Sequence, residues 1–276
     1  MSSWNKPIYK VKSNKDVLQY TTQQAGFTSI FNNFLYTYLH AKKLKQPLYV
    51  YDKNNPISLN YHILKESFIQ PSNIIYIDQQ FNQTNTISQS MIRALTGTIQ
   101  NATLQEEAAH LFRLTPEMTT CIQSELSTYS FPTFDIGVHI RSGDKITTGE
   151  MRAIPINSYI KEINAIKSKD TTNVFVMTDN IILLEALKKG VSQDIHIYSM
   201  NQNSPCASGH NQGIFNLSIK EVKLKAYIQF MTELYTMQKI PNIICTFSSN
   251  IGRYLYLTSP SITKFTSLDM KVFVAL

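Results

Sequence analysis

Residues 134–145 read Phe-Asp-Ile-Gly-Val-His-Ile-Arg-Ser-Gly-Asp-Lys, and this stretch decides the fold class. Its first half is mostly apolar, which is typical of a buried strand. Its second half holds Arg141, a tight turn at Gly143 and then Lys145. A buried strand that ends in a cationic, glycine-containing loop is how an open α/β sheet presents positive charge to an anionic ligand at its carboxyl edge.

Two side chains at the end of this strand are candidates for binding such a ligand. His139 and Arg141 share strand parity, so we expect both on one side of the sheet. An arginine there can bind a diphosphate through two parallel hydrogen bonds. From these residues alone, a surface arginine beside a core histidine is an equally good interpretation.

The rest of the chain alternates between helical and strand patterns. We expect strands at 134–140, 173–177, 194–198 and 243–246, with helices at 156–167, 181–189 and 219–237 between them. This alternation predicts a doubly wound, mostly parallel sheet. In the first half, a helix after Gly26 leads to a strand at 48–51, a unit typical of nucleotide-binding folds. We therefore predict an α/β protein with two domains, 1–130 and 131–276.

The composition excludes several other classes of protein. With 276 residues and 43% hydrophobic content, the chain can build one large core or two domains of about 130 residues each. Three widely spaced cysteines without a CxxC pair indicate neither a disulfide framework nor a zinc site. The amino terminus has no apolar signal segment, and no window approaches the ~18 consecutive apolar residues of a membrane span. We therefore expect a soluble, cytoplasmic protein with no membrane span.

The charge of the chain favours a phosphate-bearing partner in general terms. The formal net charge is +7, from 26 basic and 19 acidic residues. The densest basic cluster, Lys42, Lys43 and Lys45, lies at the end of a predicted helix, where cations favour the helix dipole. Because this excess of positive charge is spread along the chain, we predict no nucleic-acid partner. Binding to nucleic acid would show a steep salt dependence that a small-nucleotide site lacks.

Two more strands also end in polar residues. One is an apolar strand that runs into Thr178 and Asp179, again at a carboxyl edge. Another starts at Ile243 and runs into Ser248 and Ser249, which would cap the next helix. Backbone N–H groups and hydroxyls at a helix start receive phosphate readily. A plain N-cap is the alternative interpretation of these serines.

Two glutamates complete the set of candidates. Glu233 lies on the predicted helix before the serine-containing strand. Glu150 lies in the loop after the first strand, five residues ahead of Pro155. Most glutamates are solvated helix or loop residues, so neither position identifies a site by itself.

In combination and in this order, these segments resemble the α1,6-fucosyltransferases, the family of the animal core fucosyltransferases and the rhizobial nodulation fucosyltransferases. Val-His-Ile-Arg-Ser-Gly-Asp-Lys at 138–145 is similar to the family's His-x-Arg-Arg-x-Asp-Lys motif. Thr-Asp-Asn at 178–180 is similar to its Thr-Asp-Asp, and Cys-Thr-Phe-Ser-Ser at 245–249 to its motif of the same sequence. The resemblance covers residues 104–258 well and 22–45 faintly.

The resemblance implies a GT-B glycosyltransferase fold, in which two Rossmann-like lobes enclose a central cleft. It implies that Arg141 holds the β-phosphate of a nucleotide-sugar donor and that His139 touches the nucleoside. By the same resemblance, Ser248 and Ser249 bind the diphosphate.

Three further donor-binding positions follow from the resemblance. Glu233 occupies the place of the family's guanine-reading aspartate. Asp179 lies in the segment similar to Thr-Asp-Asp, and Gly26 lies in the faintly similar amino-terminal segment.

The resemblance also implies a mechanism. Glu150 aligns with the family's catalytic base if one residue is inserted after Lys145. A carboxylate there would remove the proton of the acceptor hydroxyl as the anomeric carbon is attacked from the face opposite the diphosphate, which inverts its configuration. Arg141 and Lys145 would stabilise the charge on the leaving group. The chain has no Asp-x-Asp motif, in keeping with metal-independent GT-B enzymes, so we predict no metal and no cofactor other than the nucleotide-sugar co-substrate.

Two departures from the family pattern leave the donor open. The family's second arginine is Ser142 here, and its guanine-reading aspartate is Glu233. The donor is GDP-fucose by resemblance, or a UDP-sugar such as UDP-xylose. The expected acceptor is an oligosaccharide or a glycoprotein glycan. A non-catalytic glycan-binding or nucleotide-binding module is the alternative of another class, and it would not need Glu150 as a base.

Overall fold

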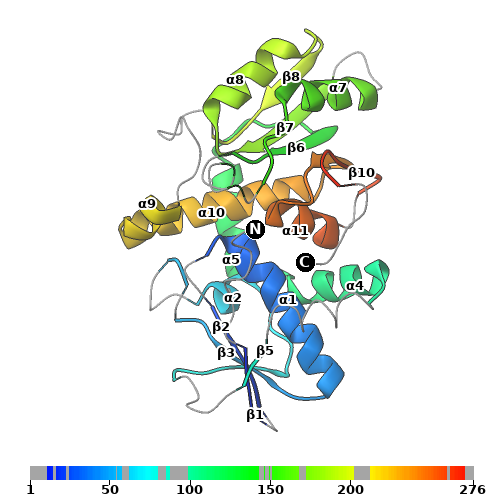
Figure 1. Ribbon diagram of the computed structural model, residues 1–276. Helices are drawn as coiled ribbons and strands as arrows, with labels where there is room; N and C mark the ends of the chain where they lie inside the picture. The colour runs from blue at the N-terminus through cyan, green and yellow to red at the C-terminus, as the bar shows by residue number, and fades with distance from the viewer. Residues whose placement is uncertain are drawn as a thin grey trace. The chain divides into compact units, whose positions relative to one another are not determined.

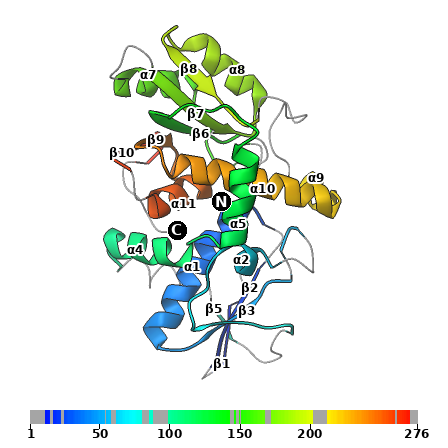
Figure 2. The ribbon, with the colours of Figure 1, turned by 180° about the vertical axis from the view of Figure 1, so that it is seen from behind.

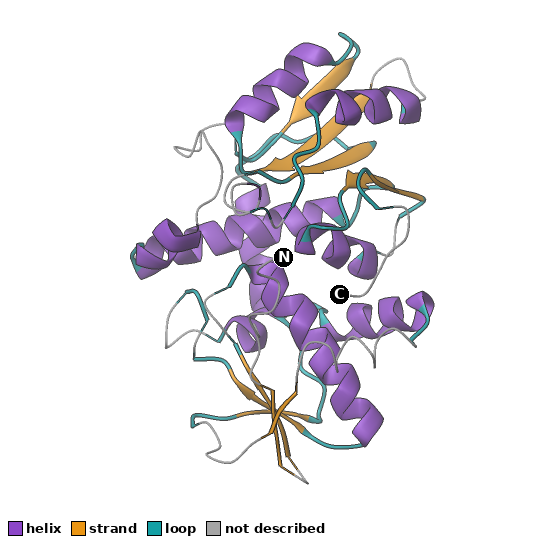
Figure 3. Ribbon diagram, in the orientation of Figure 1, coloured by secondary structure: helices purple, strands orange, loops and turns teal. Residues whose placement is uncertain are grey.

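The protein is described by a computed structural model, whose helices and strands are drawn in Figures 1 and 3. The residues that the structure describes are 11–14, 17–22, 25–53, 55–57, 62–79, 85–87, 99–142, 146, 149, 151–167, 172–201, 212–259 and 262–270.

The elements follow one another along the chain with helices between most strands. In the first part they are β1 (Val11–Asn14), β2 (Val17–Thr21), α1 (Phe27–Leu44), β3 (Leu48–Tyr51), α2 (Ile63–Ser67), β4 (Ile74–Tyr76), β5 (Asn85–Ile87), α4 (Asn101–Leu111) and α5 (Pro116–Leu126). In the second part they are β6 (Ile136–Ile140), α7 (Ile156–Ile166), β7 (Thr172–Thr178), α8 (Ile181–Gly190), β8 (Ile195–Tyr198), α9 (Gln212–Leu217), α10 (Lys220–Met237), β9 (Asn242–Cys245), α11 (Asn250–Thr258) and β10 (Lys264–Ser267).

The chain forms two compact units. The first contains the described residues up to Thr120 together with Ser218–Leu224. The second contains Cys121–Leu217 and the described residues from Lys225 onward. The domain ranges expected from the sequence, 1–130 and 131–276, stay a prediction.

The second unit is built on a five-stranded sheet with the order β10-β9-β6-β7-β8. Every pair of neighbouring strands in it is parallel. β6 comes first along the chain and lies in the centre, β7 and β8 follow on one side, and β9 and β10 lie on the other. This is the 3-2-1-4-5 order of doubly wound nucleotide-binding sheets, in which the order reverses beside the first strand. The parallel, doubly wound sheet predicted from the sequence is confirmed.

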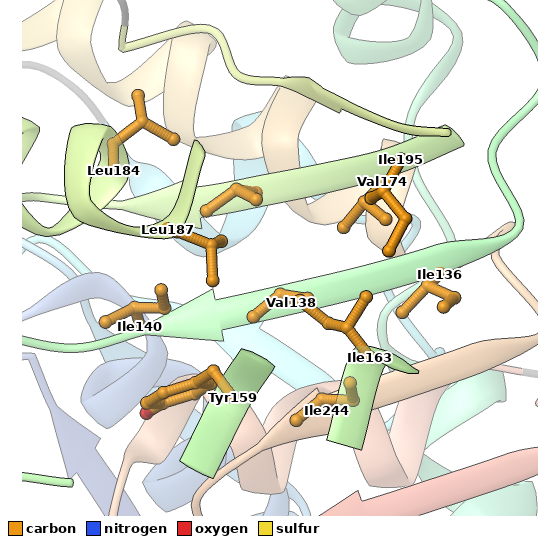
Figure 4. Close-up of a cluster of buried hydrophobic side chains, with 11 residues drawn as sticks. Ile136, Val138, Ile140, Tyr159, Ile163, Val174, Leu184, Leu187, Ile195 and Ile244 are labelled. Carbon is orange, nitrogen blue, oxygen red and sulfur yellow. The ribbon is translucent and has the colours of Figure 1, made fainter. Parts of the chain in front are cut away.

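The central strand β6 is buried on both faces, as its sequence predicts. Ile136, Val138 and Ile140 point to one face and pack with side chains of the helices α7 and α8, namely Tyr159, Ile163, Leu184 and Leu187 (Figure 4). On the other face, a Cβ added at Gly137 would lie 2.8 Å from Sδ of Met237 in α10. Both ribbon views show α7 and α8 over one face of this sheet and α10 and α11 over the other (Figures 1 and 2). Close packing on both faces gives the strand a rigid end from which a site can be built.

The first unit contains a mixed sheet with the order β4-β3-β2-β1-β5. β2, β3 and β4 are parallel to one another, whereas β1 is antiparallel to both of its neighbours. The sequence predicts α1 and β3, but it does not predict β1 and β2, because residues 8–20 carry no strong hydrophobic period. Lys42 and Lys43 lie in the last turn of α1, as predicted from the helix dipole, and Lys42 forms an ion pair with Glu107.

Candidate functional site

The carboxyl ends of β6 and β9 lie side by side where the strand order of the second unit reverses. Val138 pairs in register with Ile244, so the segment after β9 lies beside the segment after β6. In open α/β sheets, ligands bind outside the carboxyl ends of the strands at such a reversal. These two segments carry Arg141 on one side and the serines at 248 and 249 on the other.

Arg141 is held in place by Asp179, which follows β7. Oδ2 of Asp179 forms an ion pair with Nη1 of Arg141, and Oδ1 accepts the backbone N–H of Ser142 at 3.0 Å. The side chains of the arginine and the aspartate are only 14% and 17% exposed, so solvent screens their attraction little. Ile140 of β6 is paired in register with Thr178 of β7. Arg141 and Asp179 directly follow these two residues, which explains why their side chains meet. The structure thus brings the two predicted residues together, and Asp179 orients the guanidinium.

His139 is buried on the same side of β6 as Gly137, because these residues alternate with the apolar cluster. Only 2% of the residue is exposed. Burial, and secondarily the positive charge of Arg141, lower the pKa of His139 to about 3, so the imidazole is neutral at pH 7. Its Nδ1 atom is buried and has no hydrogen-bond partner within the described part of the chain. A neutral imidazole can donate one hydrogen bond and accept another, which suits recognition of a polar ligand edge.

Glu233 lies on α10, and it is linked by hydrogen bonds to the end of β7. Burial raises the pKa of this carboxyl to about 8, so the protonated form predominates at pH 7. Its Oε1 atom accepts from Nδ2 of Asn201 at 3.2 Å. The same amide donates to the carbonyl of Thr178 at 2.7 Å, and its oxygen accepts from Nε2 of Gln229 at 2.8 Å. Asn201 thus holds the glutamate near the carboxyl end of β7, which Asp179 directly follows.

The start of α11 shows how the predicted serines are used. Ser249 is the N-cap of the helix, and its Oγ accepts the backbone N–H of Ile251 at 3.2 Å. The backbone N–H of Ser248 donates to Oδ2 of Asp269 at 3.0 Å. A Cβ added at Gly252 would lie 2.1 Å from the carbonyl oxygen of Thr246, so only glycine lets α11 pack this closely against the end of β9. The N-cap interpretation of Ser249 therefore describes its hydroxyl correctly, and the helix start still offers the positive end of a helix dipole.

Sequence reasoning missed two residues of this site, Asn201 and Asp269. Each acts through backbone groups or through another side chain, and neither lies at a spacing that marks a motif. An asparagine three residues after a predicted strand and an aspartate two residues after a serine near the end of the chain were the available signals.

The roles predicted for three other residues are not tested by the structure. Lys145 and Glu150 fall on residues that the structure does not describe, as does the turn at Gly143. Gly26 belongs to the first unit, where it precedes α1 and its carbonyl accepts the N–H of Ser29 at 2.9 Å. The roles of Lys145, Glu150 and Gly26 stay predictions.

The described residues contain neither a metal-binding cluster nor a membrane-spanning helix. Among these residues, no three His, Cys, Asp or Glu side chains are grouped to hold a metal ion. Within the same residues, no helix has both the length and the hydropathy needed to cross a bilayer.

The fold is similar to solved structures of fucosyltransferases. NodZ α1,6-fucosyltransferase soaked with GDP-fucose is 12% identical to the chain with a TM-score of 0.54, over 88% of this chain and 92% of that one. The fucosyltransferase NodZ from Bradyrhizobium, in selenomethionine form, is 12% identical with a TM-score of 0.56, over 94% and 98% of the two chains. A mutant of Arabidopsis thaliana FUT1 in complex with GDP is 11% identical with a TM-score of 0.54, over 93% of this chain and 71% of that one.

These similarities bear on the fold. No protein-family model and no curated protein sequence matches the chain. The resemblance to the α1,6-fucosyltransferases that the sequence motifs predict is confirmed at the level of the fold, because the fucosyltransferase structures align with most of the chain.

Proposed function

We propose that the chain is a glycosyltransferase that binds a nucleotide-sugar donor on its second unit and transfers the sugar to a glycan. One observation carries this proposal. In a parallel sheet of doubly wound order, the two strands at the reversal end side by side, with Arg141 after one and the start of α11 after the other. The similarity to fucosyltransferases solved with GDP-fucose or GDP supports a nucleotide donor.

In this proposal, the diphosphate binds between Arg141 and the start of α11. A guanidinium suits phosphate oxygens because its N–H groups form paired hydrogen bonds with them. The helix start adds the positive end of the helix dipole. The role of Asp179 is to orient the arginine, as its ion pair with Arg141 suggests.

The nucleoside binds near His139 and Glu233. Guanine carries two N–H groups on one edge, which a carboxylate can accept. Glu233 is buried, and the amide of Asn201 links it by hydrogen bonds to Thr178 at the carboxyl end of β7. Hydrogen bonds from guanine would favour the charged carboxylate and so lower a pKa that burial has raised to about 8. GDP-fucose is therefore the donor that we propose.

The finer features of the mechanism follow from the family resemblance. Glu150 acts as the base on the acceptor hydroxyl, and Lys145 with Arg141 stabilises the leaving diphosphate. The transfer inverts the anomeric centre, needs no metal ion, and takes place in a GT-B arrangement of two lobes in the cytoplasm.

A transfer assay tests the proposal. The chain is incubated with GDP-fucose or UDP-xylose and a panel of glycan acceptors, and the released nucleotide and the extended glycan are measured. We expect fucose transfer in the wild type, a loss of at least ~100-fold in Arg141→Ala, and little change in Arg113→Ala, a matched control at an exposed position of the first unit. Binding of a nucleotide without transfer to any acceptor would favour a non-catalytic module, and transfer only from UDP-xylose would reject the fucose assignment.

A further inference from the structure

The loop between β9 and α11 is held by a carboxylate from the strand beside it. Asp269 lies two residues after β10, and its Oδ1 accepts the backbone N–H of Phe247 at 2.8 Å. Its Oδ2 accepts the N–H of Ser248 at 3.0 Å. The two carboxylate oxygens therefore accept hydrogen bonds from two consecutive backbone amides. These amides belong to the loop beside which we place the donor's diphosphate.

The position of this carboxylate is itself fixed by the end of β10. The hydroxyl of Ser267 donates to Oδ1 of Asp269 at 2.8 Å and accepts the N–H of Phe247 at 3.1 Å. The N–H of Leu268 donates to the carbonyl of Cys245 at 2.9 Å, which keeps the turn after β10 beside the end of β9. The aspartate thus reaches the loop from a backbone segment that is tied to the same sheet.

Asp269 is charged at neutral pH. Burial alone would raise the pKa of its carboxyl, but hydrogen bonds from Ser248, Ser267 and Phe247 outweigh this effect and hold the pKa below its ordinary value. Hydrogen bonds to an ionised acceptor are stronger than bonds between neutral groups. Replacing the carboxylate by a neutral group would therefore loosen the loop.

The opposite side of the loop is constrained by packing. Gly252 of α11 lies so close to Thr246 that a Cβ would come within 2.1 Å of the carbonyl oxygen. The ring of Phe247 stacks on Phe265 of β10, with centroids 5.2 Å apart and planes 11° from parallel. The loop conformation is therefore set by α11, by the aromatic stack, by the hydrogen bond from Phe247 to Ser267 and by the two hydrogen bonds to Asp269. A substitution at Asp269 removes the last two and leaves the helix and the aromatic stack in place.

We infer that Asp269 is a positioning residue for the donor site, an inference that rests on the proposed function. It keeps the amides of Phe247 and Ser248 fixed, and with them the start of α11 that receives the donor's diphosphate. It acts through the loop and does not touch the nucleotide. A carboxylate that touched the diphosphate would repel it, so its removal would strengthen binding; removal of a positioning residue weakens binding.

Calorimetric titration with GDP and with GMP tests this inference. The variants are Asp269→Ala and Asp269→Asn, the second because its NH2 group, which only donates, replaces one of the two oxygens that accept the N–H groups of Phe247 and Ser248. The matched control is Asp194→Asn, which removes a carboxylate paired with Lys167 in the same unit. We expect the Kd for GDP to rise about tenfold in both Asp269 variants and less than about twofold in the control, and we expect the Kd for GMP to rise less than the Kd for GDP, because the loop serves the diphosphate.

The outcomes separate this inference from the proposed function. If the wild type binds neither GDP nor UDP, the proposed function is wrong and the inference falls with it. If the wild type binds GDP and Asp269→Ala binds it equally well or more tightly, the inference alone is overturned. Should both Asp269 variants lose their fold by circular dichroism, Ser267→Ala serves instead, and an unchanged GDP affinity in that variant overturns the inference.

Discussion

Replacing Glu233 by glutamine should change how the stability of the protein depends on pH. The amide keeps an oxygen that can accept from Asn201 at the 3.2 Å distance seen for the carboxyl, but it cannot ionise. The folded-state pKa of Glu233 is about 8, above its ordinary value of 4.5. The stability that this group contributes is therefore fully present below pH 4.5 and is lost as the pH rises through 8.

The size of the effect follows from the two pKa values. Between pH 5 and pH 9, a carboxyl that titrates near 8 when folded and at 4.5 when unfolded removes about 4 kcal/mol from the free energy of unfolding. The glutamine variant escapes this loss. We expect it to have about the stability of the wild type at pH 5 and to be more stable by several kcal/mol at pH 9. The buried groups Asp52 and His139 titrate in both proteins, so their contributions cancel in the comparison.

Urea unfolding followed by circular dichroism at pH 5, 7 and 9 measures this difference. Glu185→Gln, which alters an exposed glutamate on α8, is the matched control and should show no added pH dependence. If the stabilities of the wild type and the Glu233→Gln variant differ by the same amount at pH 5 and pH 9, the folded-state pKa of Glu233 is not raised to about 8.

Three further predictions concern GDP binding and the metal dependence of transfer. Asp179→Ala should raise the Kd for GDP about tenfold in calorimetry, because it removes the partner of Arg141; an unchanged Kd would show that the ion pair does not orient the arginine. GDP binding at pH 7 should release close to one proton, because guanine favours the charged form of Glu233; titrations in buffers of different ionisation enthalpy measure this release, and proton uptake would contradict the assignment. Transfer should continue at the wild-type rate after treatment with EDTA, and a loss that added magnesium restores would contradict metal independence.

The sequence predicts most of the second unit because its elements carry strong local signals. β6 and β7 are mostly apolar and are followed by polar residues, and α8 and α11 begin at the side-chain caps Asn180 and Ser249. β10 was not predicted, because its four residues contain one large apolar side chain, and its place depends on the parallel pairing with β9. Pairing of this kind joins distant residues and leaves no local period.

The same distinction applies to the candidate site. The positions of Arg141 and Asp179 at adjacent strand ends were predictable, because each follows an apolar run. The contact of Asp269 with the amides of Phe247 and Ser248 was not, because backbone donors carry no sequence signal. The hydrogen bond from Asn201 to Glu233 was likewise not predictable. The residues next to Asn201 in the sequence form no motif that would identify it as part of a site.

A crystal structure of the chain grown with GDP would locate the donor site. The proposed donor site requires a diphosphate at the carboxyl ends of β6 and β9, with phosphate oxygens hydrogen-bonded to Arg141 and to the start of α11, and with the guanine edge on Glu233. A diphosphate bound away from these strand ends, or a guanine that does not touch Glu233 or His139, would contradict it.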